Sequence, residues 1–360
     1  MRIERVEPIL VNIPYTYGTA GAKHQMKMNV LFVRVDTDEG ITGWGEAFGF
    51  GISPVTREAI ETLLAPRCIG REIGDPAAFT ENLGYQFKSA GRTGPIVFGV
   101  SGIDIALWDI VGQAAGKPIH QLLGTKRRER IPAYASLLGF HNVEEAARNA
   151  AAAVADGYRH VKLHETDTPS VAAARAAIGA DIPLMVDVNC AWTPDEGLRM
   201  AREWEPYALR WLEEPVWPPE DHAAMKRIRA ETRVPIASGE NASSALALIA
   251  LAQDGIVDVV QPSVTKFGGI SALRPVIAAA EAANVEVALH SPYLGPGLVA
   301  TVHLIAAMER DVVAERFYLD FEASPMRGFT DVTDGTLPVP SAPGLGVAPD
   351  QAFLERYRIA

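Results

Sequence analysis

Apolar and polar positions in the first 125 residues predict strands followed by helices. Residues 1–50 hold three runs rich in β-branched and aromatic side chains, IERVEPILVNI, MNVLFVRVDT and ITGWGEAFGF, which are typical of strands. Residues 54–66, 76–90 and 96–116 carry apolar side chains at helical spacing. The last of these segments ends at Gly116, before a Lys-Pro pair that cannot continue a helix. The pattern predicts an α+β domain over residues 1–125.

The pattern changes after the basic, turn-rich stretch GTKRRERIP at residues 124–132. Apolar runs of four to six residues then alternate with alanine-rich helical segments, which predicts a parallel sheet with helices outside it. We therefore place a second domain at residues 126–319. We expect the C-terminal segment, residues 320–360, to pack back on the first domain.

A polar or charged residue marks the C-terminal end of each predicted strand, and successive ones are 24 to 27 residues apart. They are Ser136, Lys162, Asp187, Glu213, Glu240, Lys266, His290 and Glu315. About 25 residues suffice for one strand, one helix and two short loops. Eight such units predict an α/β barrel of the TIM type, in which function resides at the C-terminal strand ends. A doubly wound open sheet is the alternative, but no G-x-G-x-x-G motif follows the first strand.

Three of these strand ends, on consecutive strands, carry carboxylates: Asp187, Glu213 and Glu240. Converging carboxylates raise one another's pKa unless a cation lies between them. Oxygen ligands with room for water favour Mg²⁺ over Zn²⁺, so we predict one Mg²⁺ held by this trio. Taken singly, each acid could instead pair with a lysine or an arginine. Glu214 points to the opposite face of its strand and is expected to support the ligands.

Basic residues surround the predicted metal site. Lys162 and His164 are two residues apart and share one face of a strand, although an isolated K-x-H is more often a solvated edge strand. Lys266 and His290 follow on later strands. A metal-bound carboxylate substrate can lose its α-proton, because the metal stabilises the enediolate, and a nearby histidine can take that proton. His164 and His290 are the candidate base and acid, with buried structural histidines as the alternative. Lys162 is expected to lower the pKa of its neighbour and to contact the substrate carboxylate.

The motifs at these strand ends resemble those of the enolase superfamily, in its mandelate racemase branch. They are the K-x-H run, DVN, EEP, GEN, K-x-GG and the late histidine, together with SGIDIALWDIVGQAAGKPIHQLLG at residues 101–124. The resemblance covers essentially the whole chain. It implies a modified (β/α)₇β barrel, an N-terminal α+β capping domain, and Mg²⁺ on Asp187, Glu213 and Glu240. It implies carboxylate substrates, typically acid sugars, that are dehydrated or racemised through an enediolate.

By the same resemblance, residues 15–27 and 48–52 should close over the barrel. Their candidates for contacting the distal end of the substrate are Tyr15, Tyr17, Lys23, His24 and Phe50. A polar loop without that role is the alternative.

Two positions depart from the usual pattern of the branch. His164 stands where a second lysine is common, and Ser263 stands where an aspartate usually pairs with the late histidine. Without that carboxylate His290 is a weaker base but can still donate a proton, with Glu315 or Lys266 as groups that could retune it. This favours an acid-sugar dehydratase, with His164 as base and His290 as acid. A racemase, epimerase or cycloisomerase is the main alternative, and a Schiff-base aldolase using Lys162 or Lys266 is a remote one.

Net charge and composition limit the classes of binding partner and the cellular compartment that we expect for this protein. The net charge of −11 argues against a nucleic-acid surface and offers no basic patch to a membrane, while leaving a small carboxylate substrate open. Cys68 and Cys190 are too few for a disulfide framework, so a reducing cytoplasm is expected. No signal-peptide pattern and no apolar run of about 18 residues is evident, so we expect no membrane span. A symmetric homo-oligomer is the default assembly.

Overall fold

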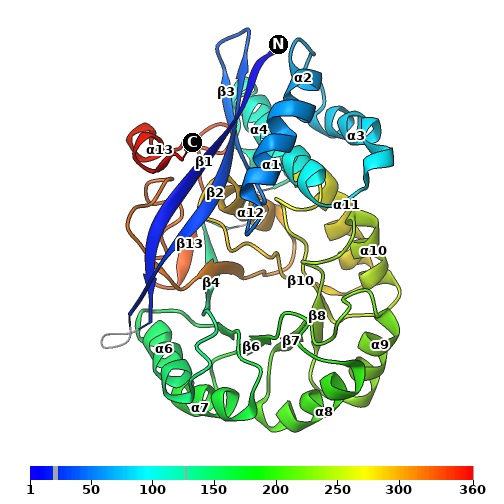
Figure 1. Cartoon of the computed structure of the whole chain (residues 1–360), viewed down its shortest axis with the longest axis vertical. Helices are drawn as coiled ribbons and strands as arrows, with labels where there is room; N and C mark the ends of the chain where they lie inside the picture. The colour runs from blue at the N-terminus through cyan, green and yellow to red at the C-terminus, as the bar shows by residue number, and fades with distance from the viewer. Residues whose placement is uncertain (19–22, 126–127, 360) are drawn as a thin grey trace.

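The computed structural model describes residues 1–18, 23–125 and 128–359. Figure 1 shows a sheet with flanking helices above a ring of strands that is surrounded by helices, and both chain ends lie on the upper part. The first part is the predicted α+β capping domain, and the second is the predicted parallel barrel. The predicted domain limits at residues 125 and 319 fall between named helices and strands, and the limit at residue 126 lies outside the described residues.

The capping domain is built on a four-stranded antiparallel sheet in the order β12-β1-β2-β3. The strands are β1 (Ile3–Tyr17), β2 (His24–Thr37), β3 (Thr42–Ala47) and β12 (Asp320–Phe321). The helices are α1 (Ser53–Ala59), η1 (Ile60–Leu64), α2 (Ala65–Cys68), α3 (Pro76–Gln86), η2 (Lys88–Ala90), α4 (Pro95–Ala114) and α5 (Ile119–Leu123). The three predicted helical segments are confirmed, with a π-helical turn inside the first and a short 3₁₀ turn closing the second.

Helix α4 packs directly on strand β3, because glycines remove the side chains between them. A Cβ at Gly45 would lie 1.8 Å from the carbonyl oxygen of Gly102. The expectation that no apolar run is long enough to span a membrane is wrong for α4, which passes that test by length and composition. However, 78% of its apolar window is buried inside the protein, as in the core helix of a folded domain.

Eight parallel strands form the second part, in the order β10-β9-β8-β7-β6-β5-β4-β11. They are β4 (Arg130–Ser136), β5 (Val161–Leu163), β6 (Leu184–Asp187), β7 (Trp211–Glu213), β8 (Ile236–Ser238), β9 (Val259–Val260), β10 (Glu286–Val287) and β11 (Ala314–Phe317). Strand β13 (Thr336–Pro338) pairs antiparallel with β4. Where β10 and β11 approach each other, the Ser291 backbone N–H donates to Glu315 Oε2 at 3.0 Å, so a side-chain contact bridges this part of the ring.

Helices lie outside this ring, as the alternating pattern predicted (Figure 1). They are α6 (Val143–Ala155), α7 (Thr168–Ile178), α8 (Pro194–Trp204), α9 (His222–Glu231), α10 (Ala245–Gln253), α11 (Gly269–Ala282) and α12 (Pro296–Ala307), with the turn η3 (Glu205–Tyr207) after α8 and α13 (Gln351–Tyr357) near the end. Helices α6 to α10 each begin after a residue whose side chain accepts a backbone N–H of the first turn: Asn142, Asp167, Thr193, Asp221 and Ser244. These caps define where each loop ends and its helix starts.

The period-two pattern of the strands separates an apolar layer from a polar one inside the barrel. Tyr134, Met185, Trp211, Ala237, Val259 and Ala288 form one buried cluster across the strands. Asp187 follows Met185 by two residues on β6, and Glu213 follows Trp211 by two residues on β7. Each acidic residue therefore lies on the same face of its strand as the apolar residue before it. The charged side chains therefore stand on an apolar floor at the C-terminal strand ends.

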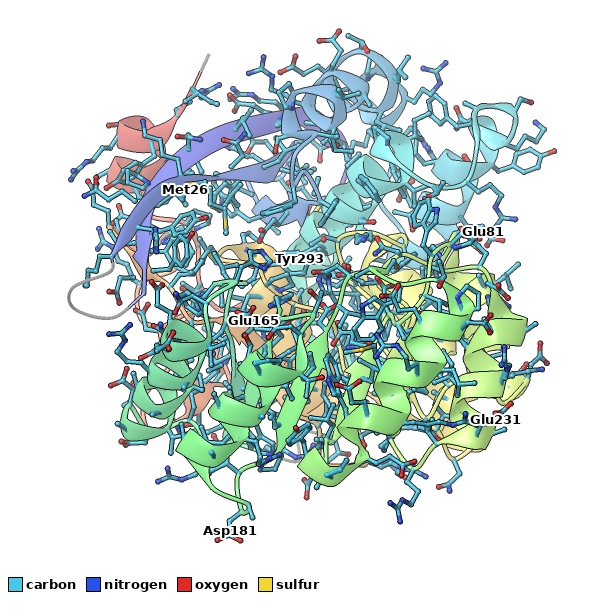
Figure 2. The ribbon with its side chains drawn as sticks, turned by 60° about the horizontal axis from the view of Figure 1, so that its bottom comes forward. Met26, Glu81, Glu165, Asp181, Glu231 and Tyr293 are labelled. Carbon is cyan, nitrogen blue, oxygen red and sulfur yellow. The ribbon has the colours of Figure 1, made fainter. Side chains whose placement is uncertain are left out.

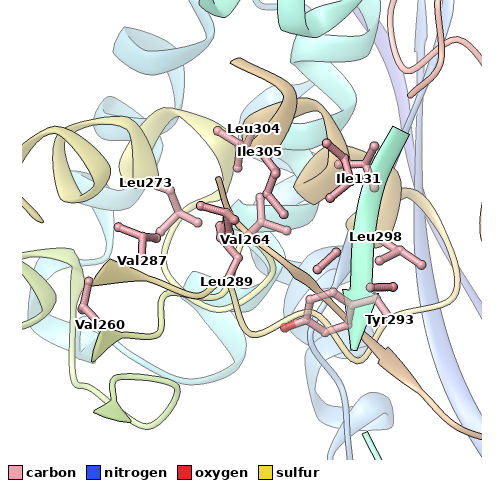
Figure 3. Packing of buried hydrophobic residues seen from close by; sticks show 14 of the residues in the cluster. Ile131, Val260, Val264, Leu273, Val287, Leu289, Tyr293, Leu298, Leu304 and Ile305 are labelled. Atoms are coloured by element: carbon pink, nitrogen blue, oxygen red, sulfur yellow. The ribbon is translucent and has the colours of Figure 1, made fainter. Parts of the chain in front are cut away.

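The segment after residue 320 returns to the capping domain, since β12 pairs with β1 and α13 contacts β1. The main hydrophobic core joins the two parts, and it includes residues of β1, β2, α12 and the barrel strands. Figure 3 shows one region of this core, which includes Leu289, Leu298, Tyr293 and Ile131.

Candidate active site

Lys162 lies at the centre of a buried ion network. Its side chain is 1% exposed, and Nζ lies 3.0 Å from Glu213 Oε1, 3.0 Å from Glu315 Oε1 and 3.3 Å from Asp187 Oδ2. Burial lowers the pKa of Lys162, but the charges of Glu213 and Glu315 outweigh it and raise that pKa well above its usual value. Lys162 is therefore a permanent cation here. A Schiff-base lysine needs a neutral amine, so Lys162 is poorly suited to the aldolase alternative.

The three predicted metal ligands lie on adjacent strands. Asp187 pairs with Glu213 in the β6–β7 register, and Glu240 follows β8. Burial and the charge of Asp187 raise the pKa of Glu213 to about 7, whereas the pKa of Asp187 lies well below its usual range because Lys162 and His164 offset its burial. Asp187 thus holds its charge while Glu213 is pushed toward the neutral form.

The carboxylate oxygens bind basic groups of the chain. Within residues 1–18, 23–125 and 128–359, no three acidic, histidine or cysteine side chains already lie together as a ready set of metal ligands. Lys162 contacts Asp187 and Glu213, and His290 Nε2 contacts Glu240 Oε2. The donor set still fits a hard divalent cation, because it offers only carboxylate oxygens and carries more negative charge than Lys162 neutralises. A metal bound here would offset the carboxylate charge that these basic groups leave unneutralised.

His164 follows β5 on the same face as Lys162, as the sequence predicted. Its Nδ1 contacts the carbonyl oxygen of Leu137, and its Nε2 lies 3.3 Å from Asp187 Oδ2. The predicted lowering of the His164 pKa by Lys162 is present as one contribution. Burial and Lys162 do lower that pKa, but the hydrogen bond and charge of Asp187 outweigh both, so it is raised overall.

His290 has a different set of neighbours. Its Nε2 contacts Glu240, and its Nδ1 lies 3.4 Å from the hydroxyl of Tyr293. That hydroxyl also makes a hydrogen bond with Ser263 Oγ. A pair of hydroxyls therefore stands where the related branch usually places a carboxylate. No signal in the sequence indicated Tyr293, because it follows His290 in a loop and belongs to no motif.

Asn241 connects the outer groups of the site. Its backbone N–H and Nδ2 both donate to Glu214, at 3.2 and 2.6 Å, and Nδ2 also donates to Glu240 Oε1 at 3.0 Å. Lys266 Nζ donates to Asn241 Oδ1 at 3.1 Å. Glu214 thus supports the ligand strand ends through Asn241. Asn241 belongs to the GEN motif, but only its glutamate carried an expected role.

A cavity of about 530 Å³ opens between the barrel mouth and the capping domain. His164, His290, Lys266, Asp187, Glu240 and Glu315 all line it. Lys162 and Glu213 lie beneath this wall and are almost fully buried. The expected contact between Lys162 and a substrate carboxylate stays a prediction. Figure 2 shows Tyr293, another residue of the cavity wall, between the blue cap sheet and the green barrel helices.

The capping domain contributes residues different from most of those expected. Of the five candidates, Phe50 lines the cavity, and Tyr15, Tyr17, Lys23 and His24 do not. Tyr15 packs on Phe321, the rings of Tyr17 and His24 stack with centroids 4.7 Å apart, and Lys23 pairs with Asp320 at 3.1 Å. These side chains hold the β1–β2 hairpin against its surroundings. Residues 19–22 of the predicted loop lie outside the described residues.

The cavity wall on the cap side is mainly apolar. It is formed by Met28, Val30, Leu31, Ala47, Phe48, Phe50, Ile52 and Phe98, with Asn29, Glu46 and Thr93 as polar members. No lysine or arginine of the described residues other than Lys266 lines the cavity. Glu46 was not predicted, because a single acid at the end of an apolar strand gives no signal of a site.

Two family models match this chain. One, described as "Mandelate racemase / muconate lactonizing enzyme, N-terminal domain", matches residues 9–124. The other, described as "Enolase C-terminal domain-like", matches residues 145–353. Together they cover most of both domains.

Individual proteins agree with these matches. A "D-galactonate dehydratase family member" from Streptomyces bingchenggensis is 30% identical over 91% of this chain and 90% of its own length. A "D-galactarolactone cycloisomerase" from Agrobacterium fabrum is 29% identical over 95% and 94%. The crystal structure of a mandelate racemase/muconate lactonizing protein from Paracoccus denitrificans, complexed with magnesium, superposes with a TM-score of 0.88 at 26% identity, covering 99% of this chain and 97% of that one.

Proposed function

Because this chain belongs to the mandelate racemase/muconate lactonizing enzyme family of the enolase superfamily, we propose that it removes the α-proton of an acid sugar and eliminates an oxygen from the neighbouring carbon. The observation that carries the proposal is that two histidines and two acidic residues at strand ends line one cavity. His164 and His290 line the same space as Asp187 and Glu240. Proton removal at one carbon and proton donation at the next require two such groups.

Asp187, Glu213 and Glu240 are the residues that would hold Mg²⁺. A bound Mg²⁺ would supply the positive charge that makes a carboxylate's α-proton acidic enough to remove. Oxygen-only donors support this choice, and so does the magnesium complex of the Paracoccus protein. Lys162, fixed as a cation beneath the ligands, would neutralise part of their charge in the absence and in the presence of metal.

His164 is the proposed base. His164 lines the cavity, and when its Nδ1–H donates to the carbonyl of Leu137, Nε2 would be free to accept a proton once a cation at Asp187 takes over its present contact with that carboxylate. His290 is the proposed acid, which would protonate the leaving oxygen. If that oxygen is a hydroxyl, the reaction is a dehydration to a 2-keto-3-deoxy acid. If it belongs to a ring, the same elimination opens the ring without loss of mass, which is a cycloisomerisation. The Agrobacterium relative is named for a reaction of the second class.

The substrate we propose carries one carboxylate. The basic residues of the described cavity wall, His164, Lys266 and His290, lie at its metal end, while the cap side is apolar apart from Asn29, Glu46 and Thr93. A second carboxylate buried against that apolar side would lack a partner, which is costly. Monocarboxylic acid sugars, including those with an internal ring, fit this distribution better than dicarboxylic ones.

The test is a screen of mono- and dicarboxylic acid sugars and their anhydro forms with Mg²⁺ in D₂O. We expect monocarboxylates to give a 2-keto acid that semicarbazide traps, with product mass separating loss of water from ring opening. His164→Asn should abolish turnover together with exchange of the α-hydrogen, while His290→Asn should retain exchange. A product that is only the epimer of the substrate would support a racemase instead. Full activity in both variants would overturn the assignment of acid and base.

A further inference from the structure

Tyr293 lies at the side of His290 that faces away from the predicted metal ligands. Its ring packs edge-on to His290, with centroids 6.1 Å apart and planes at 85°, and its hydroxyl lies 3.4 Å from Nδ1. Tyr293 is 6% exposed and Ser263 is fully buried. The hydroxyl of Ser263 bonds to that of Tyr293 and lies 3.5 Å from Thr265 Oγ1. Three hydroxyls therefore lead through the core to one ring nitrogen.

The two ring nitrogens of His290 have partners of opposite character. Nε2 contacts a carboxylate oxygen of Glu240, which can only accept a hydrogen bond. A neutral imidazole carries one N–H, so a hydrogen on Nε2 leaves Nδ1 as an acceptor. The Tyr293 hydroxyl can then donate to Nδ1 while it accepts from Ser263. Burial raises the pKa of Tyr293, so this hydroxyl keeps the proton that it donates.

We propose that Tyr293 is the positioning residue that holds His290 with its proton on Nε2, so that His290 presents a donor to the cavity. This rests on the proposed function, in which His290 is the acid. A carboxylate at position 263 could only accept, and would favour the opposite tautomer with a bare Nε2 suited to a base. The hydroxyl chain therefore determines the direction in which His290 transfers a proton.

The tautomer is read by ¹⁵N NMR of histidine-labelled, Mg²⁺-loaded protein in mildly alkaline buffer, with His290→Asn assigning the resonances. In the wild type we expect Nε2 to be protonated and Nδ1 bare. Tyr293→Phe should give a mixture of tautomers. Ser263→Ala should leave the tautomer unchanged, because the tyrosine can still donate. Tyr158→Phe removes the hydroxyl of another buried tyrosine, 7% exposed, and should change nothing at His290.

Kinetics give the second measurement. General acid assistance contributes about 10²–10⁴-fold, so Tyr293→Phe should lower kcat roughly 10- to 100-fold with little change in KM. Exchange of the α-hydrogen, which needs His164 alone, should persist.

An unchanged tautomer in Tyr293→Phe would overturn the inference, even in an active enzyme. A wild type that turns over no acid sugar would overturn the proposed function, and the NMR result would still decide the role of Tyr293. If Tyr293→Phe does not fold, Ser263→Asp replaces it, and retention of the Nε2 proton there would refute the argument.

Discussion

Glu46 is a buried carboxyl that joins the capping domain to the barrel. It lies near the end of β3 and is 4% exposed. Its Oε2 accepts from the backbone N–H groups of Gly295 and Gly297, at 3.1 and 2.9 Å, where α12 begins. Burial raises the pKa of Glu46 to about 7, although the N–H groups of Gly297 and Gly295 lower it. The substitution Glu46→Gln keeps a carbonyl acceptor for these bonds and removes the titration.

The direction in which pH changes the stability of the protein follows from the number of protons that the folded and unfolded states bind. Between pH 4.5 and about 7 the folded protein keeps a proton on Glu46 that the unfolded chain has released. Stability therefore falls as pH rises through this window. A carboxyl whose pKa rises from 4.5 to about 7 on folding costs about 3 kcal/mol above that window. For a chain of this size, that corresponds to about 4 °C in Tm.

The assay is thermal unfolding of both proteins with EDTA present, at about pH 5 and about pH 8. Asp104 and Asp109, whose pKa values burial raises to about 7 and about 6, titrate in the same range in both proteins. The quantity to compare is therefore the difference in Tm between variant and wild type, and how that difference changes from the lower pH to the higher one. Glu46→Gln should gain relative to wild type as pH rises. Glu4→Gln, an exposed change on β1, is the control and should show no such gain. A Tm difference for Glu46→Gln that stays constant with pH would refute the reasoning.

Three further predictions concern the ion network, the metal and the cap. Lys162→Met leaves buried carboxylates without their cation, so the free energy of unfolding of the metal-free protein, measured with urea, should fall by about 3–5 kcal/mol. A stability equal to that of the wild type would contradict the ion network. EDTA should abolish turnover, and Mg²⁺ at about 100 times its Kd should restore it and add about 2.7 kcal/mol of stability; turnover that is indifferent to EDTA would exclude the metal. Gly45→Ala should destabilise by about 3 kcal/mol in thermal or urea unfolding, because its Cβ meets the carbonyl of Gly102. The matched change Gly84→Ala, in α3 with open space around it, should stabilise by about 0.5–1 kcal/mol, and equal effects would show that the contact between β3 and α4 is not as tight as described.

The sequence by itself determined the barrel, the cap helices and the positions of the acidic strand ends. Each strand and its helix repeat at about 25 residues, so residues such as Asp187 and Glu213 recur at one height through local geometry alone. The face shared by Lys162 and His164 follows from the two-residue period of a strand in the same way.

Only the tertiary structure decided which groups meet at the site. Lys162 lies under the ligands because the β4, β5, β6 and β11 strands bring Glu315 and Asp187 to it from distant parts of the chain. Tyr293 reaches His290 through a loop that has no sequence period, and the cap supplies Phe50 and Glu46 to the cavity and leaves Tyr15 outside it. Contacts of this kind depend on how non-local segments pack, and no repeat along the chain encodes that packing.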